Sequence, residues 1–493
     1  MYKQHNEINK VVMFFPPGWE SIMPPPGISY IKSFLMNNGY KVNCFDFGVE
    51  LGGRFFDGSK TKLDSCAKKI LSLEPDVVGF TTLQPKLRHV KNTLYIVEKI
   101  KEQSPRTIVV AGGPHVAYVK EEILKFDFID FAVKGEGELG FLNLLNSSEL
   151  RSKLIDSRIV LKSPYVEDLN QLPFPNFDDF NLDQYQLGLL PLSTSRGCKM
   201  NCTFCGVRAN QVCGPYRERK PSKVIDEIKQ DIEKYGKNRF GITDALLNIN
   251  PRSTRKLCEA IIKNDLEIKW IAGALPHISN EDLGKMYDSG CRLLYLCPET
   301  GSPDTAKKMK KGIKLDIAEK TIINAAKKGI VVSAWFIIGF PGETYDDIKY
   351  TEKFAERIRP YCLEIVFVPF SFYKGSYIYS NPKEFGIEKF EESPLDINIR
   401  KYYGKNILPP SESIRLSLQL WNKYDVTGDP YPFLNHTKEE IEALLQIIPL
   451  EKREEVAQYI ENSKRKELYN YYKIFNIAFN DEIYEKLSPL AFS

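Results

Sequence analysis

Three cysteines lie close together near the middle of the chain. They are Cys198, Cys202 and Cys205, with three residues between the first pair and two between the second. Thiolates are soft ligands that suit iron–sulfur centres. A four-iron cluster needs four ligands, so three cysteines leave one iron open, as three protein ligands do in a catalytic zinc site. The spacing predicts a metal centre with a free position for a substrate or cofactor.

Two other interpretations of this loop remain open. Zinc modules usually pair two knuckles of cysteines spaced two residues apart, and no second knuckle follows here. A chance group of buried cysteines is the second alternative. The other cysteines downstream are scattered in apolar or helical runs, and we interpret them as packing residues: Cys213, Cys258, Cys291, Cys297 and Cys362.

Composition narrows the class of protein. The 493 residues are enough for about three domains. Lys and Arg exceed Asp and Glu by 68 − 64 = +4, which does not indicate a nucleic-acid binder. No stretch approaches the roughly 20 apolar residues of a membrane span, and the polar N-terminus has no apolar signal core. We expect a cytoplasmic protein that binds neither nucleic acid nor membrane.

Strands and helices alternate over residues 1–150, which predicts an α/β domain with a doubly wound parallel sheet. The expected strands are 11–15, 41–45, 76–80, 107–111 and 128–133. Ligands of such sheets bind outside the carboxyl ends of the strands, where glycine lets backbone approach closely. The candidate residues in these loops are Gly27, Thr81, Thr82, Gln84, Gly113, Pro114, His115, Gly135, Glu136 and Gly137. Simple turn punctuation is the alternative.

The cysteine loop, with Phe204 just before its third cysteine, resembles the signature of radical S-adenosylmethionine (SAM) enzymes. Six β/α units between about residues 191 and 369 are similar to the partial (β/α)6 TIM barrel of that family. Their strands are expected at 192–195, 240–243, 268–272, 292–296, 331–338 and 364–368. The resemblance implies that the candidate SAM contacts lie at the carboxyl ends of these strands. They are Phe204, Asp244, Glu299, Gly339 and Pro341, with Gly342 and Glu343 in the same segment.

Each of these contacts has a structural alternative. Phe204 could serve loop packing, Glu299 could pair with a lysine, and the segment at Gly339 could be a simple turn. Asp244 and Arg217 are weaker candidates than the others. Aromatic residues on the barrel strands could face a substrate, although such residues are usually core: Tyr295, Trp335 and Tyr373.

The first segment resembles the cobalamin-binding domain found upstream of such radical domains, so the resemblance spans about residues 9–380. Many cobalamin modules carry a histidine two residues after an aspartate, but Asp46 is followed by Phe47 and Gly48. Coordination of cobalt by His115 is disfavoured. The resemblance implies three cofactors: a [4Fe-4S] cluster, SAM and cobalamin.

The resemblance also implies a mechanism. A reduced cluster would cleave SAM to methionine and a 5′-deoxyadenosyl radical, and methylcobalamin would supply a methyl group. The partners would be a one-electron reductant of the flavodoxin or ferredoxin type and a small-molecule or peptide substrate. We expect the loop edges of both sheets to line one cavity.

The preferred function is methylation of an unactivated carbon. Alternatives are ring contraction, cyclisation or oxidation on the same cofactors, and, from another class, a zinc-binding interaction protein. Methylthio transfer is disfavoured, because Cys44 and Cys66 alone cannot supply a second cluster site. We expect a cobalamin domain (1–150), a linker (151–190), a radical SAM barrel (191–383) and a helical C-terminal domain (384–493).

Overall fold

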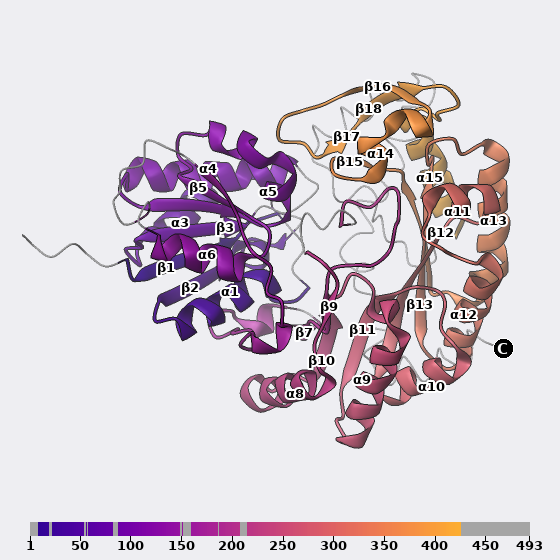
Figure 1. Cartoon of the computed structure of the whole chain (residues 1–493), viewed down its shortest axis with the longest axis horizontal. Coiled ribbons are helices and arrows are strands. Elements are labelled where there is room, and N and C mark those ends of the chain that lie inside the picture. Colours follow the sequence, from indigo (N-terminus) through magenta and orange to yellow (C-terminus); the bar gives the residue numbers. More distant parts are fainter. Residues whose placement is uncertain are drawn as a thin grey trace, which may run out of the picture. The chain divides into compact units, whose positions relative to one another are not determined.

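The computed structural model describes a large part of the chain, in two compact units. The described residues are 8–18, 22–53, 56, 58–81, 87–147, 150, 159–185, 187–207 and 214–424. Unit 1 comprises Met1–Pro191, Asn210–Arg219 and Ser393–Ile397. Unit 2 comprises Leu192–Ala209, Lys220–Glu392 and Asn398–Ser493. Each unit is built around its own parallel sheet (Figure 1).

The sheet of unit 1 has six strands in the order β2-β1-β3-β4-β5-β6, and all neighbours are parallel. The strands are β1 (Lys10–Phe15), β2 (Lys41–Asp46), β3 (Val77–Thr81), β4 (Ile108–Gly112), β5 (Phe131–Lys134) and β6 (Ile159–Lys162). The apolar runs form strands because both faces of the sheet are covered. The predicted doubly wound sheet is confirmed. However, β6 lies in the segment that we expected to be a linker. Its four residues are too few to give a strand pattern in the sequence, and the strand is defined by its pairing with β5.

Helices cover this sheet on both faces (Figure 1). Helix α1 packs against α6, and α3 packs against α4. The helices are α1 (Pro26–Asn37), α2 (Phe47–Glu50), α3 (Lys60–Leu71), α4 (Leu87–Gln103), α5 (Pro114–Val119) and α6 (Gly137–Asn146). Short 3-10 turns follow at Lys120–Lys125, Leu169–Gln171 and Leu182–Gln184, and unit 1 also holds β9 (Arg217–Glu218). Strand β2 lies on one side of β1, and β3, the next strand along the chain, lies on the other side. The switch point of the sheet is therefore between β1 and β3.

The second sheet, most of whose strands belong to unit 2, has the order β14-β13-β12-β11-β10-β7, which confirms the partial barrel. Its strands are β7 (Leu189–Leu192), β10 (Arg239–Ile242), β11 (Lys269–Ala274), β12 (Cys291–Glu299), β13 (Val331–Ile338) and β14 (Glu364–Pro369). The helices are α8 (Pro221–Tyr235), α9 (Pro251–Lys263), α10 (Asn280–Asp288), α11 (Pro303–Met309), α12 (Leu315–Lys327) and α13 (Tyr345–Ile358). They lie along the outer side of the curved sheet (Figure 1). Strand β7 ends at Leu192, where we expected the first strand to begin.

Local signals explain where these helices start and stop. Helix α13 begins with the predicted capping box, in which the Thr344 side chain and Asp347 bond each other's backbone N–H groups. Helix α8 buries Val224 and Ile228 on one face and ends at Gly236, which has φ of +64°. Left-handed backbone at a helix end suits glycine, because glycine has no Cβ to clash.

The chain beyond β14 starts with strands, whereas we expected mostly helices from residue 384. Its elements are β15 (Phe372–Tyr373), α14 (Tyr377–Ser380), β16 (Ile387–Glu391), β17 (Asn398–Ile399), β18 (Lys401–Gly404) and α15 (Pro410–Tyr424). Strand β15 pairs with β17 and β16 with β18, both antiparallel. Helix α15 packs on β13 and β14. The helical spacing of Ile441, Leu444, Leu445 and Ile448 lies outside the described residues.

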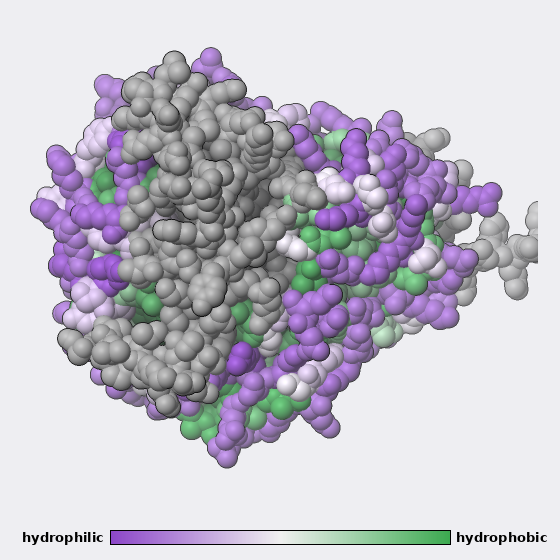
Figure 2. Space-filling view, turned by 180° about the vertical axis from the view of Figure 1, so that it is seen from behind, coloured by the Kyte–Doolittle hydropathy of each residue, from purple (hydrophilic) through white to green (hydrophobic). Residues whose placement is uncertain are grey.

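The surface of the described chain is mixed in character. Hydrophilic residues and small hydrophobic areas alternate over the coloured part of the face in Figure 2. Large apolar side chains that are exposed are few; they include Met36 on α1, Ile262 on α9, and Tyr345 and Tyr350 on α13. Isolated residues of this kind are normal on folded domains. No helix among the described residues is long and apolar enough to cross a membrane.

Candidate active site at the ends of the barrel strands

The three-cysteine loop follows the short strand β8 (Ser195–Arg196). Cys202 is buried, and Cys198 and Cys205 are half-buried. Burial raises the pKa of the Cys202 thiol to about 12, and the nearby Lys311 ammonium opposes this rise. The other two loop cysteines also interact electrostatically with Cys202. Three thiols on one loop suit an iron–sulfur cluster by their chemistry. Their atoms are not placed as a preformed metal site, and no other group of three ligands in the described chain is.

Thr203 fixes the loop beside Cys202. This fully buried residue donates its N–H to the Met309 carbonyl at 3.0 Å and its hydroxyl to the Lys308 carbonyl at 3.1 Å. Its own carbonyl accepts from Ile378 N–H at 3.0 Å. Thr203 therefore joins the loop to the end of α11 and to α14. Sequence reasoning missed it, because a threonine inside a cysteine motif gives no sign of its distant partners.

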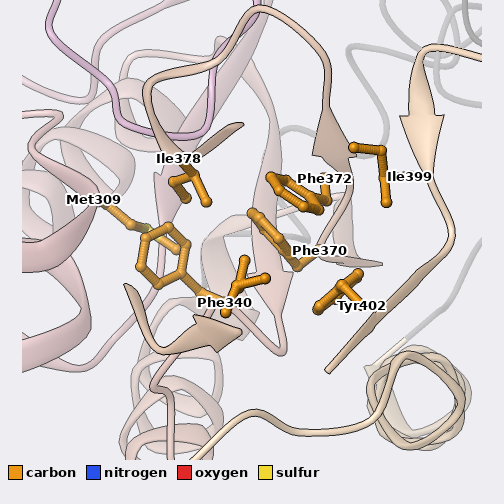
Figure 3. Close-up of a cluster of buried hydrophobic side chains, with 8 residues drawn as sticks. Met309, Phe340, Phe370, Phe372, Ile378, Ile399 and Tyr402 are labelled. Atoms are coloured by element: carbon orange, nitrogen blue, oxygen red, sulfur yellow. The ribbon is translucent and has the colours of Figure 1, made fainter. Parts of the chain in front are cut away.

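Phe204 packs against a cluster of buried side chains. Its ring meets Phe340 edge-on, with centroids 6.4 Å apart. The cluster consists of Met309, Phe340, Phe370, Phe372, Ile378, Ile387, Ile399 and Tyr402, most of them drawn in Figure 3. The structural alternative for Phe204, loop packing, is thus present in the structure. A contact of Phe204 with adenine stays a prediction.

Glu299 ends β12 and forms a buried ion pair. Lys311 Nζ lies 2.5 Å from Glu299 Oε1 and 2.9 Å from the Cys297 carbonyl oxygen. Burial lowers the pKa of Lys311, but Glu299 and the neighbouring thiols more than offset this and hold it raised. Glu299 has φ of +70°, which is unusual for a residue with a side chain. The structural alternative for Glu299, pairing with a lysine, is therefore present in the structure. A role of Glu299 in binding SAM stays a prediction.

The residues after Glu299 are packed tightly against α13. Gly301 donates its N–H to the Thr351 hydroxyl at 2.9 Å, and Thr300 bonds the same hydroxyl at 3.1 Å. A Cβ on Gly301 would lie 2.6 Å from the Thr351 Cα. Ser302 caps α11 and donates its hydroxyl to Asp347. The segment is therefore held rigidly where β12 ends.

Asp244 follows β10 and is already engaged by neighbouring side chains. Its carboxylate accepts from Thr194 N–H at 2.7 Å, the Thr194 hydroxyl at 2.5 Å and the Ser195 hydroxyl at 2.6 Å. Burial raises the pKa of Asp244, and these hydrogen bonds oppose the rise. Asp244 thus positions the residues that lead into the cysteine loop. A direct contact with SAM stays a prediction.

The turn after β13 is built around a buried carboxyl group. Gly339 has φ of +83° and donates its N–H to Glu343 Oε2 at 2.5 Å. Burial raises the pKa of Glu343 to about 8. A Cβ on Gly339 would lie 1.8 Å from the Ser413 Oγ of α15, so only glycine allows this approach. Lys308 Nζ donates to the Gly342 carbonyl at 2.6 Å, while Pro341 is buried within the turn. The close approach of Ser413 explains why residue 339 is glycine. Contact of this turn with adenine stays a prediction.

Aromatic and polar side chains gather on β12, β13 and β14. Tyr295 and Trp335 meet edge-on with ring centroids 6.4 Å apart, and both are half-buried. Trp335 Nε1 donates to the Ser333 hydroxyl at 2.8 Å, and Ser333 donates to the buried Glu364. Sequence reasoning missed Ser333 and Glu364, which are isolated polar residues in apolar strands. Tyr373, on β15, is half-buried as well.

In unit 1, the predicted cobalamin residues that are described lie at the carboxyl end of the sheet. They are Gly27 in the first turn of α1, Thr81 at the end of β3, Gly113, Pro114 and His115 after β4, and Gly135, Glu136 and Gly137 after β5. Thr82 and Gln84 lie outside the described residues. Gly113 and Gly135 have φ of +91° and +108°. Glycine backbone at a sheet edge suits a large planar ligand such as a corrin.

His115 is buried and bonded through its ring. Its Nε2 lies 2.7 Å from the Leu395 carbonyl oxygen, which can only accept. Nε2 must therefore carry the proton and is not free to ligate cobalt in this arrangement. At the end of β2, where other cobalamin modules have histidine, Gly48 has no side chain. The glycine-rich edge fits a corrin held by backbone, and coordination of cobalt by His115 stays disfavoured.

Glu136 and Arg217 form a bidentate pair within unit 1. Arg217 Nη2 lies 2.6 Å from Glu136 Oε1, and Arg217 Nη1 lies 3.0 Å from Glu136 Oε2. Glu136 Oε2 also accepts from Val166 N–H at 2.8 Å. Fork-to-fork pairs of this kind combine strength with directional specificity. The structure therefore gives both residues a positioning role; direct contacts with cofactors stay predictions.

Comparison with known proteins agrees with this geometry. The family model of the radical SAM superfamily matches residues 192–355, and that of the B12 binding domain matches residues 19–145. An uncharacterized methyltransferase of Pyrococcus horikoshii is 28% identical over 375 residues, covering 71% of this chain and 79% of the relative. An anaerobic magnesium-protoporphyrin IX monomethyl ester cyclase of Rubrivivax gelatinosus is 26% identical, covering 71% of this chain and 66% of the relative.

Solved structures show the same fold. The radical SAM methyltransferase TsrM from Kitasatospora setae, with cobalamin and a [4Fe-4S] cluster bound, aligns with a TM-score of 0.66 at 14% identity. The alignment covers 93% of this chain and 99% of TsrM. Fold and sequence together define a radical SAM enzyme that also carries a B12-binding domain.

The chain combines a radical SAM domain with a B12-binding domain, and the proteins it resembles include some that are named methyltransferases. Its cofactors are the [4Fe-4S] cluster, SAM and cobalamin, as predicted. As a radical SAM enzyme it needs a reductant and a substrate. The radical SAM match favours an enzyme over the alternative of a zinc-binding interaction protein.

Proposed function

We propose that this enzyme transfers a methyl group to an unactivated carbon of a small metabolite or peptide. The observation that supports the proposal most is the presence of two matched domains in one chain, one for radical chemistry and one for a methyl carrier. The methyltransferase names of the Pyrococcus and Kitasatospora proteins point the same way. An unactivated carbon is the substrate that justifies a radical route, because polar methyl transfer needs a nucleophile.

The proposal assigns roles to the chain's own residues. Cys198, Cys202 and Cys205 would hold the cluster, which when bound supplies the electron that cleaves SAM. Glu299, held by Lys311, would present a carboxylate to the polar groups of SAM. The turn at Gly339 would support the adenine with backbone.

The remaining residues of the proposal shape and hold the site. Asp244 orders the entrance to the cysteine loop through Thr194. Tyr295 and Trp335 would exclude water from the barrel interior around the substrate. In unit 1, the glycine-rich edge that includes Gly113 and Gly135 would hold the corrin through backbone.

Anaerobic turnover with product analysis tests the proposal. The reconstituted enzyme, with cobalamin, SAM, reductant and candidate substrates, should form both 5′-deoxyadenosine and S-adenosylhomocysteine. The product should be heavier than the substrate by one methylene unit. Formation of 5′-deoxyadenosine with no S-adenosylhomocysteine and no methylated product would contradict methyl transfer.

A second candidate is a radical reaction without methyl transfer, such as ring formation. The similarity to the cyclase of Rubrivivax gelatinosus, which covers 71% of this chain and 66% of the cyclase, favours it. The same experiment separates the two candidates. A cyclisation would give 5′-deoxyadenosine and a product of lower hydrogen content, with SAM consumed only by reductive cleavage.

A further inference from the structure

Exposed lysines occur in the stretch that joins the end of α11 to the start of α12, two helices labelled in Figure 1. They are Lys307, Lys308, Lys310 and Lys314. Two exposed aspartates, Asp304 and Asp316, lie in the same stretch, so its exposed charge is 4 − 2 = +2. Within the described residues, none of the four lysines forms an ion pair, whereas Lys285 and Lys311 of the same unit do. Although Asp304, Asp316 and Asp347 lie nearby, the stretch keeps a net positive charge.

Two of these lysines, Lys307 and Lys310, line an open groove of about 490 Å³. It is lined by Pro303, Ala306, Lys307, Lys310, Gly312, Ile313, Leu315 and Asp316. Small and apolar residues form much of the lining, and charged residues accompany them. Protein interfaces typically combine an apolar centre with a polar rim. The groove therefore has the character of a docking surface for another protein.

This surface is joined directly to the cysteine loop. Thr203, the residue next to Cys202, bonds the carbonyl groups of Lys308 and Met309 at 3.1 Å and 3.0 Å. The backbone between Lys307 and Lys310 is thus one hydrogen bond from the loop that would hold the cluster. A protein docked over these lysines would therefore contact the segment that is hydrogen-bonded to the cysteine loop.

We propose that this lysine surface is the docking site of an acidic one-electron donor protein. The inference rests on the proposed function, which needs one electron per SAM cleaved. One electron leaves the donor, which is oxidised by one unit, and the cluster is reduced by one unit. Opposite charges steer such transient encounters and speed association. The basic surface next to the thiol loop selects an acidic partner over a neutral or basic one.

Charge reversal tests the proposal. The Lys307→Glu/Lys310→Glu variant changes two lysines that line the groove and leaves Lys308, which bonds Gly342, intact. The matched control is Lys256→Glu/Lys263→Glu, which reverses two exposed lysines on α9. Binding of a bacterial flavodoxin to the holoenzyme is measured at low salt by calorimetry. We expect its Kd to rise about tenfold in the groove variant, equivalent to about 1.4 kcal/mol, and less than twofold in the control.

Chemical cross-linking locates the docking site directly. Zero-length carbodiimide cross-linking of flavodoxin to the wild-type enzyme should join donor carboxylates to Lys307, Lys310 or Lys314. The Lys307→Gln/Lys310→Gln variant, which removes charge without reversing it, should show an intermediate Kd. Unchanged flavodoxin affinity in both groove variants, or cross-links confined to other surfaces, would overturn the proposal.

Chemical reduction separates this inference from the proposed function. With dithionite in place of flavodoxin, the groove variants should cleave SAM at the wild-type rate, because the small reductant needs no docking surface. If the wild type itself fails to cleave SAM with dithionite, the proposed function fails, while the binding and cross-linking results still decide the docking site.

Discussion

Lys311 Nζ lies 2.5 Å from Glu299 Oε1, and the two side chains are only 5% and 11% exposed. The same ammonium bonds the Cys297 carbonyl and lowers the pKa of the Cys202 thiol against the larger effect of burial. One buried cation thus links the end of β12 to the cysteine loop. Because charges are costly to bury singly, each partner depends on the other.

Removing Lys311 alone should destabilise unit 2 strongly. We expect Lys311→Met to lower the free energy of unfolding by about 3–5 kcal/mol, because Glu299 is left buried and unpaired. Adding Glu299→Gln should recover part of this loss, which denaturant unfolding of the two single variants and the double variant measures. Strictly additive losses would show that the two side chains do not depend on each other. SAM affinity of Glu299→Gln then tests the proposed contact separately.

Replacing the three loop cysteines by alanine should remove the cluster. The Cys198→Ala/Cys202→Ala/Cys205→Ala variant should show no iron–sulfur absorbance and form no 5′-deoxyadenosine, while cobalamin binding by unit 1 persists. Cys258→Ala is the matched control, because Cys258 is buried in α9 and away from the loop. Stoichiometric iron and sulfide retained in the triple variant would refute the ligand assignment.

Gly339 should not tolerate a side chain. Gly339→Ala places a Cβ 1.8 Å from Ser413 Oγ at φ of +83°, so we expect a loss of about 2–4 kcal/mol in unfolding free energy. Adding Ser413→Gly should restore part of it by removing the clash. Gly284→Ala in α10 meets no atom within 4 Å and should stabilise slightly. Thermal unfolding of these variants makes the comparison, and a wild-type melting temperature for Gly339→Ala would contradict it.

Glu343 should make stability depend on pH. Burial raises the pKa of Glu343 from 4.5 to about 8 in the folded state. Between these values the folded protein binds a proton that the unfolded chain does not, so stability falls as pH rises from about 4.5 to 8. Glu343→Gln keeps the acceptor for Gly339 N–H but cannot ionise. The melting temperature of the variant minus that of the wild type should increase from about pH 4.5 to 8 and level off above pH 8. A difference that does not change with pH would be inconsistent with the raised pKa of Glu343.

Much of the architecture can be predicted from local sequence patterns. Apolar runs such as Val11–Phe15 and Val331–Ile338 form strands, because burial on both faces of a parallel sheet requires such runs. The capping box at Thr344 and Asp347 is equally local and is confirmed. Strand β6 and the strands between Ile387 and Gly404 were not predicted, because short edge strands depend on partners that pattern alone does not reveal.

The kind of chemistry can be predicted from local sequence, because thiol spacing and glycine placement are properties of consecutive residues. The tertiary structure alone decided which distant groups meet: Lys311 with Glu299, Thr203 with Met309, and Gly339 with Ser413. These contacts join residues on separate elements, and burial turns them into obligatory pairs, since an unpaired buried charge or polar group is costly.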